Sequence, residues 1–207
     1  SKFISFFLRF KKKINFENSL NLTHIQIIQD ILKKMECTFN PDDFNILLDR
    51  KYTKVIANNY IVFHYDEKWS KNTYISSYTD IEPNYDELYY FLNMLSEKTQ
   101  LDVIVTTGTK IPPLFSKLLN NNINKKIIFL KDQNFLDLEN VISKSYLLIS
   151  CHGAVSHVAS AHNIKQIDII ETNKNNPYDR WTSHFRNYKS LKRNKFSNLS
   201  NQILNNL

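Results

Sequence analysis

From about residue 60 onward, short apolar runs alternate with segments whose apolar residues recur at helical spacing. The runs are rich in β-branched residues, which is typical of buried parallel strands. They predict five strands at residues 60–65, 101–107, 126–130, 146–151 and 166–171. The intervening segments predict four helices at residues 85–98, 112–120, 135–143 and 155–163. Residues 178–207 predict one or two closing helices. This alternation favours an α/β fold, a Rossmann-like doubly wound parallel sheet with helices on both faces.

The segment before this core contains an amphipathic helix. Residues 24–35 place apolar side chains on one helical face, and Thr23 precedes them as a suitable N-cap. Residues 41–59 fit short strands and loop equally well. We therefore expect a linker and amphipathic-helix segment over residues 1–59, which would be the end of a preceding domain, and a Rossmann-like domain over residues 60–207.

The composition is that of a soluble globular protein, since 42% of the residues are hydrophobic. No stretch approaches the ~20 apolar residues of a membrane span. The first dense run of positive charges follows the first apolar run, whereas in a secretory signal the positive charges precede it. A cytoplasmic location is expected. Cys37 and Cys151 lie far apart and show no metal-ligand spacing. We expect a buried free thiol at each, no metal site and no cofactor.

A formal charge of +7 fits a nucleic acid, an anionic membrane or a phosphorylated ligand. Nucleic acid is not the expected partner, because zinc-finger spacing and RNA-binding signatures are missing from the sequence. The basic runs 9–13 and 186–195 are typical of solvated surface. Apolar residues directly before the first run also fit a peripheral contact with an anionic membrane, here the inner membrane.

The chain contains two glycines, and each follows a predicted strand and precedes a predicted helix. In open α/β sheets, ligands bind beyond the carboxyl ends of the strands, where a glycine lets the backbone approach a phosphate and the next helix offers its first amides. Gly108, between Thr107 and Thr109, suits an oxyanion, and a simple tight turn explains it equally well. Gly153 has more support, because three of the four alanines fall in the helix that begins near Ala154.

Polar side chains surround the second glycine. His152, Ser156 and His157 lie at the start of the same predicted helix. Ser156 is placed to donate to a phosphate oxygen, and His157 to reach a phosphate or a ribose. A histidine packed between helix and sheet is the structural alternative for His157.

The stretch after the first strand is polar and contains Lys68, Ser70 and Lys71. A lysine at this end of the sheet would neutralise the charge that develops on a diphosphate leaving group, and a surface lysine is an equally good interpretation of each. Asp66 and Glu67 lie beside them, but a second acid that would complete a general acid and base pair is not evident. Catalytic residues are therefore not assigned.

The sequence GAVSHVASA, residues 153–161, resembles the corresponding turn of glycosyltransferase family nine, the heptosyltransferases of lipopolysaccharide synthesis. That family has an acid, a small hydroxyl residue, glycine, a few residues, then histidine, a hydrophobe and alanines. Here Cys151 and His152 stand at the acid and hydroxyl positions, and one extra residue separates the glycine from the histidine. Lys71 is the nearest match to a lysine of the family, with Lys68 as the alternative. The resemblance extends from about residue 23 to the C-terminus.

The resemblance implies the donor-binding, C-terminal half of an inverting glycosyltransferase of the two-domain GT-B fold. The implied partners are a nucleoside diphosphate sugar and a glycan or lipid-linked acceptor of surface glycan or lipopolysaccharide synthesis. The implied donor-binding residues are Ser70, Lys71, Thr107, Gly108, Thr109, His152, Gly153, Ala154, Ser156 and His157. In the family an N-terminal half binds the acceptor and supplies the catalytic base, so this chain is expected to bind donor without completing the reaction.

Two other functions are compatible with the same residues. One is a sugar-nucleotide epimerase of the same fold, which would need acid and base groups in the cleft. The other is a non-enzymatic nucleotide-binding or nucleic-acid-binding module that relies on the positive charge.

Overall fold

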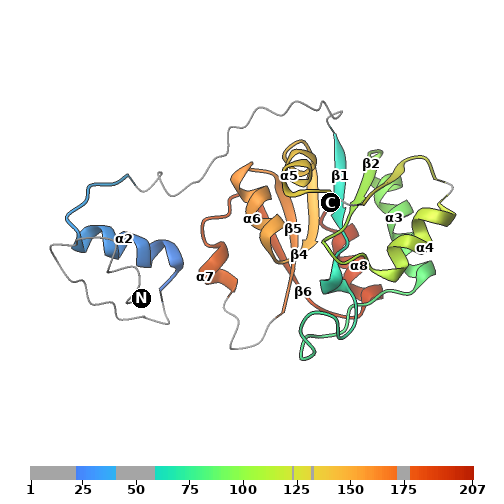
Figure 1. The fold of residues 1–207 in the computed structure, drawn as a ribbon, viewed down its shortest axis with the longest axis horizontal. Helices are drawn as coiled ribbons and strands as arrows, with labels where there is room; N and C mark the ends of the chain where they lie inside the picture. Colours follow the sequence, from blue (N-terminus) through green and yellow to red (C-terminus); the bar gives the residue numbers. More distant parts are fainter. Residues whose placement is uncertain (1–21, 41–58, 123, 132, 172–177) are drawn as a thin grey trace. The chain divides into compact units, whose positions relative to one another are not determined.

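A computed structural model gives the structure of the chain over residues 22–40, 59–122, 124–131, 133–171 and 178–207 (Figure 1). The chain divides into two compact units, one made of residues 1–45 and 177–184 and the other of residues 46–176 and 185–207. The predictions for residues 1–21 and 41–58, including the basic run near the start, lie outside the described residues. No helix in the described ranges is long and apolar enough to cross a membrane.

The smaller unit contains helices α2 (His24–Lys34) and α7 (Tyr178–Thr182). Thr23 caps α2 as predicted, because its Oγ1 accepts from the backbone N–H of Gln26 at 3.2 Å. The Gln26 Oε1 accepts in return from the Thr23 N–H at 2.8 Å, which completes a capping box. The expectation of a buried thiol at Cys37 is wrong: this residue follows the helix at a polar end and is exposed.

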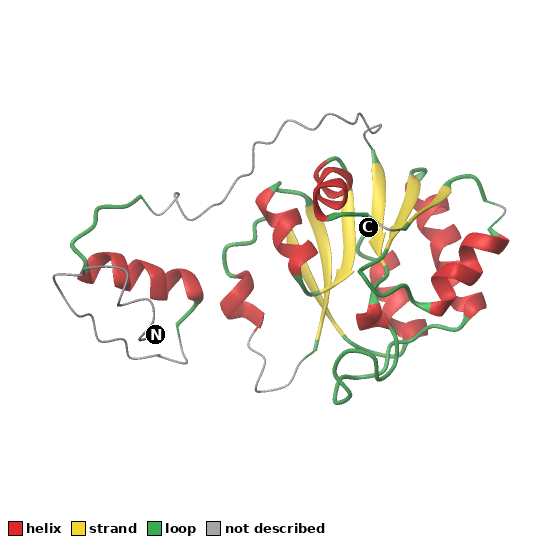
Figure 2. Cartoon of the chain, in the orientation of Figure 1, coloured by secondary structure: helices red, strands yellow, loops and turns green. Residues whose placement is uncertain are grey.

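Within the described residues, the larger unit is built on a six-stranded parallel sheet in the order β3-β2-β1-β4-β5-β6 (Figure 2). The strands are β1 (Tyr60–His64), β2 (Asp102–Thr106), β3 (Ile127–Leu130), β4 (Leu147–Cys151), β5 (Lys165–Ile170) and β6 (Tyr188–Lys192). The helices are η2 (Glu67–Trp69, a 3-10 turn), α3 (Tyr85–Thr99), α4 (Pro113–Asn121), α5 (Phe135–Ser143), α6 (Ala154–Ala161) and α8 (Phe196–Leu204). This order is that of the doubly wound Rossmann fold, in which the two halves diverge between β1 and β4.

Helices cover both faces of the sheet, so the strands are buried on both sides (Figure 1). On one face, Phe63 of β1 packs with Phe91 of α3 and Phe196 of α8 in a cluster of large apolar side chains. On the other face, Val62 of β1 packs with residues of α5 and α6 such as Ala159. Alternate residues of each strand therefore point to opposite helix layers.

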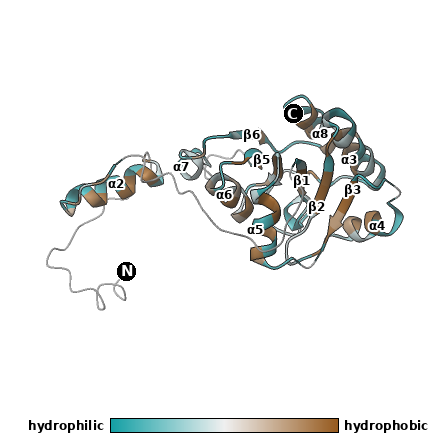
Figure 3. Cartoon of the chain, turned by 90° about the horizontal axis from the view of Figure 1, so that it is seen from above, coloured by the Kyte–Doolittle hydropathy of each residue, from teal (hydrophilic) through white to brown (hydrophobic). Residues whose placement is uncertain are grey.

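The sheet has one strand more than the five that the sequence predicts. Residues 178–207 contain β6 between α7 and α8, rather than helices alone. The strand has the sequence YKSLK, and its side chains are exposed or half-buried because it pairs only with β5 at the edge of the sheet. Figure 3 shows β6 largely hydrophilic, whereas β2 is hydrophobic. The apolar run that identifies a buried strand is missing here.

Candidate functional site

Polar residues gather at the carboxyl ends of β1 and β4, the point where the strand order reverses. In open α/β sheets the crevice at this position is where ligands bind, because the loops after the two strands turn to opposite sides. The loop after β1 contains η2, and the loop after β4 contains Gly153 and leads into α6. The two loops contact each other across this point, because Lys68 of the first lies against Gly153 of the second.

A row of buried polar side chains crosses the sheet just below these loops. In the strand register, His64 pairs with Thr106 on one side and with Ser150 on the other, and Ser150 pairs with Asp168. All four are buried. The His64 Nδ1 lies 2.9 Å from the Thr106 Oγ1. This row places hydrogen-bonding groups where the rest of the strands is apolar, and it forms the floor of the site.

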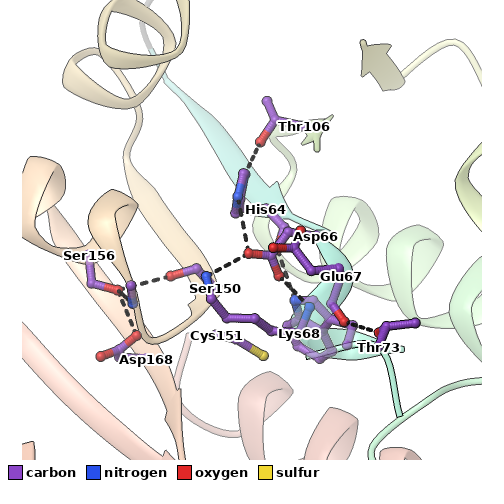
Figure 4. Close-up of polar contacts among 12 residues, drawn as sticks. His64, Asp66, Glu67, Lys68, Thr73, Thr106, Ser150, Cys151, Ser156 and Asp168 are labelled. Carbon is purple, nitrogen blue, oxygen red and sulfur yellow. Dashed lines mark hydrogen bonds and ion pairs between the residues drawn. The ribbon is translucent and has the colours of Figure 1, made fainter. Parts of the chain in front are cut away.

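Asp66 and Lys68 lie on the β1 side of the site. Figure 4 shows Asp66 between His64 and Lys68. The Asp66 Oδ1 accepts from the backbone N–H of Lys68 at 3.1 Å and so caps η2. The Oδ2 accepts from the Lys68 Nζ at 2.7 Å and lies 3.6 Å from the His64 Nε2. The Trp69 Nε1 donates to the His64 carbonyl at 2.9 Å, which fixes the turn to the end of β1. Lys68 is thus held at both its backbone and its ammonium.

The Asp66 and Lys68 side chains are both charged at neutral pH. Burial acts to raise the pKa of Asp66, but hydrogen bonds and charges from His64 and Lys68 outweigh it and hold the pKa below its ordinary value. Burial acts to lower the pKa of Lys68, and the charge and hydrogen bond of Asp66 outweigh it, so this pKa is raised. Asp66 therefore keeps the Lys68 ammonium charged at the switch point at neutral pH.

Both glycines of the chain lie against this same turn. A Cβ on Gly153 would be 2.6 Å from the Lys68 Nζ, and a Cβ on Gly108 would be 3.0 Å from the Glu67 Oε2 and 3.3 Å from the Asp66 Cβ. Gly153 has an extended φ of 172°, so its backbone does not require glycine. A side chain here would instead displace the Lys68 ammonium, which lies where a Cβ would be.

The start of α6 rests on a buried carboxylate. The Ser156 Oγ donates to the Asp168 Oδ1 at 2.8 Å, and the Tyr188 OH donates to the Oδ2 at 3.1 Å. The His152 Nδ1 lies 2.5 Å from the same Oδ2. Gly153 has no side chain with which to cap α6, and its N–H donates to the Ser156 Oγ at 3.4 Å; the helix begins at Ala154 beside the Lys68 ammonium. Asp168 thus fixes both the loop before α6 and its first turn from below.

Arg193, which follows β6, connects the turn after β1 with the end of β4. Its Nη2 donates to the Lys68 carbonyl at 2.7 Å, and its Nε donates to the Thr79 carbonyl at 3.1 Å. Its Nη1 lies 3.5 Å from the Cys151 Sγ. Burial raises the pKa of the Cys151 thiol well above its ordinary value, although the charge of Arg193 acts against this rise. Cys151 is therefore neutral, and it is buried as predicted.

The structure brings several of the predicted site residues together and separates others. Gly153, Ser156 and His152 lie around the start of α6, next to Lys68. Lys71 is 60% exposed and pairs with the Asp80 Oδ2 at 3.3 Å. The remaining predicted residues are placed as follows: Ala154, His157 and Thr109 are exposed, Thr107 is buried, Gly108 is half-buried against η2, and Ser70 ends η2.

The residues of the site that were not identified from the sequence include His64, Asp168 and Arg193. The first two have a common signal, since each is an ionisable residue in a strand that also contains a buried apolar run: His64 ends YIVFH, and Asp168 lies within KQIDII. A buried polar residue needs a partner, so such a position marks a polar network. Arg193 carries no comparable signal, because it lies within a basic run. Among the described residues, no group of three or more His, Cys, Asp and Glu side chains is placed to hold a metal ion.

The fold has counterparts among solved structures. E. coli heptosyltransferase WaaC with ADP-2-deoxy-2-fluoro heptose matches 96% of this chain and 60% of its own, at 10% identity and a TM-score of 0.58. E. coli ADP-heptose lipopolysaccharide heptosyltransferase II matches 72% of this chain and 45% of its own, at 11% identity and a TM-score of 0.52. The chain thus spans about half the length of these enzymes. A UDP-GlcNAc 2-epimerase of Methanocaldococcus jannaschii is a weaker match, with a TM-score of 0.47 at 14% identity, covering 88% of this chain and 46% of that one.

These likenesses are in structure and not in sequence. No protein-family model and no curated protein sequence matches the chain. At such identities the shared property is the fold: a Rossmann-like domain of the kind found in GT-B glycosyltransferases.

Proposed function

We propose that this chain is the donor-binding domain of a glycosyltransferase and that its ligand is a nucleoside diphosphate sugar. The observation that carries the proposal is the contact of Lys68 with Gly153 at the switch point of the sheet. There a fixed ammonium and the start of α6 lie side by side, and Gly153 brings no side chain to that end of the helix. Anions bind at helix N-termini because the first backbone amides point outward and the helix dipole is positive there.

The chemistry of a diphosphate fits these groups. An ammonium has three donors, of which Asp66 accepts one at 2.7 Å. The other donors and the first amides of α6 would bind phosphate oxygens, with His152 and His157 at the rim. In an inverting transfer, a nucleophile of the acceptor displaces the diphosphate at the anomeric carbon. Lys68 and the amides would then stabilise the negative charge on the leaving group.

The comparisons support a nucleotide-sugar-related domain of this fold. E. coli WaaC is the heptosyltransferase whose structure contains ADP-2-deoxy-2-fluoro heptose, and it has the same fold over most of this chain. We propose that a second domain supplies the catalytic base and binds a glycan or lipid-linked acceptor, as in surface glycan or lipopolysaccharide synthesis. On this proposal the isolated chain binds the donor and does not turn it over.

Calorimetric titration with ADP, UDP and GDP tests the proposal. The wild-type chain should bind at least one of them saturably, and Lys68→Met should weaken that binding at least tenfold, since a charge-assisted hydrogen bond contributes about 1.5–3 kcal/mol. Lys71→Met is the matched control and should bind as the wild type does, because Lys71 is mostly exposed and paired with Asp80.

Two results would contradict the proposal. One is a wild-type chain that binds none of the nucleotides. The other is tight binding of DNA that falls steeply with salt and is unaffected by Lys68→Met, which would favour a nucleic-acid-binding module.

A further inference from the structure

A small pocket opens beside Lys68, between residues 70–81 and Arg193. The chain after η2 folds back toward Arg193 and encloses a volume of about 120 Å³. The pocket is too small for a whole nucleotide, for which pockets of roughly 300–1,000 Å³ are typical. It suits one ring of a larger ligand.

The wall of this pocket is held in place by hydrogen bonds at several points. The backbone N–H of Thr79 donates to the Glu171 Oε2 at 2.7 Å, and the Thr79 carbonyl accepts from Arg193. Nearer η2, the Thr73 Oγ1 donates to the Glu67 carbonyl at 2.6 Å. Arg193 also lies over the Tyr78 ring, with 5.3 Å from its guanidinium carbon to the ring centroid. The wall is therefore tied to η2, to the segment after β5 and to the segment after β6.

The lining combines aromatic rings with planar polar groups. Tyr74 and Tyr78 lie edge to face with ring centroids 6.2 Å apart, and Asn72 and Asp80 supply an amide and a carboxylate. An aromatic face packs against the C–H groups of a sugar ring, while amides and carboxylates hydrogen-bond its hydroxyls. The Tyr74 side chain is half exposed, so a ligand can reach its ring.

The position of the pocket links it to the proposed diphosphate site. Lys68 lines the pocket, its Nζ lies 5.6 Å from the Tyr74 ring centroid, and the same Nζ fills the space beside Gly153. A group attached to a diphosphate bound by Lys68 would therefore lie beside Tyr74. We infer that this pocket is the subsite for the sugar ring of the donor, with Tyr74 as the surface on which the ring packs. The inference rests on the proposed function.

The test compares each nucleoside diphosphate with its own sugar derivative by calorimetry: ADP with ADP-heptose and ADP-glucose, UDP with UDP-glucose and UDP-GlcNAc, and GDP with GDP-mannose. The wild-type chain should bind at least one sugar nucleotide more tightly than the nucleotide alone. Tyr74→Leu should remove that gain, roughly tenfold, and leave the affinity for the nucleotide unchanged. Tyr90→Leu is the matched control, because Tyr90 is an exposed tyrosine on α3 that does not line the pocket.

The outcomes separate the two proposals. If the nucleotide binds but no attached sugar adds affinity, or if Tyr74→Leu keeps the full gain, the sugar subsite is wrong and the proposed function stands. If Tyr74→Leu weakens nucleotide and sugar nucleotide equally, the residue supports the diphosphate site instead, and the inference is again wrong. If the wild-type chain binds no nucleotide, the proposed function fails and the inference fails with it.

Discussion

The substitution Gly153→Ala separates binding from stability more sharply than any other in this site. The added Cβ would lie 2.6 Å from the Lys68 Nζ, whereas favourable contacts between such atoms begin at about 3.5 Å. The ammonium must therefore retreat by about 1 Å. Its 2.7 Å hydrogen bond to Asp66 would then be lengthened wherever this movement leads away from the carboxylate.

The expected magnitudes follow from these distances. Displacing the ammonium from the bound phosphate removes about 1.5–3 kcal/mol, which corresponds to a roughly 10- to 100-fold weaker affinity for a nucleoside diphosphate. The free energy of unfolding should change by less than about 1 kcal/mol. An extended φ of 172° accepts alanine, and the smaller conformational entropy of the unfolded alanine chain offsets part of the weakened ion pair.

The assay is a double-mutant cycle with calorimetric binding and urea denaturation of each variant. Gly153→Ala acts through Lys68 in this account, so it should cost little further affinity in the Lys68→Met background. Unchanged affinity in the single variant would refute the reasoning. So would a full loss of affinity that persists without the lysine, because the methyl group would then act on the ligand directly.

Two further outcomes follow from the buried carboxylates. Asp168→Ala should lower the free energy of unfolding in urea by about 1–3 kcal/mol, because it removes the buried acceptor of the Ser156 and Tyr188 hydroxyls and the contact with His152; a loss below 1 kcal/mol would contradict this. The pKa of Asp66 is lower in the folded state than its ordinary value of 3.8, so its carboxylate stabilises the fold above that value and the contribution is lost as the pH falls through the folded pKa. Unfolding measured from pH 6 to pH 2 should show a fall in stability below about pH 4 that is shallower in Asp66→Asn, and equal slopes would disprove the assignment.

The alternation of strands and helices could be predicted from the sequence because the central strands are apolar on both sides. β1 to β5 lie within one or two residues of the predicted ranges. β6 could not be found this way, since an exposed edge strand has no apolar run. The same physical rule therefore explains both the correct predictions and the missing strand.

The site was harder to predict because it depends on which strands are neighbours. The polar row of His64, Ser150 and Asp168 exists only in the strand register, and spacing along the chain does not reveal it. The sequence favoured Lys71 over Lys68, which lies three residues before it, as the match to the family's lysine. The 3-10 turn settles their positions: it directs Lys68 to Gly153 and leaves Lys71 at the surface.

The hydrogen bond from Arg193 to the Lys68 carbonyl bears on the order in which the parts of the protein fold. The guanidinium contacts Lys68 across 125 positions of the chain, and it reaches that carbonyl only once β6 has paired with β5. Closing so long a loop is entropically costly and slow, whereas the apolar centre of the sheet can collapse earlier. A chain in which β6 has not yet paired with β5 would therefore lack the contact that holds the Lys68 carbonyl, and on the proposed function it would bind the donor more weakly.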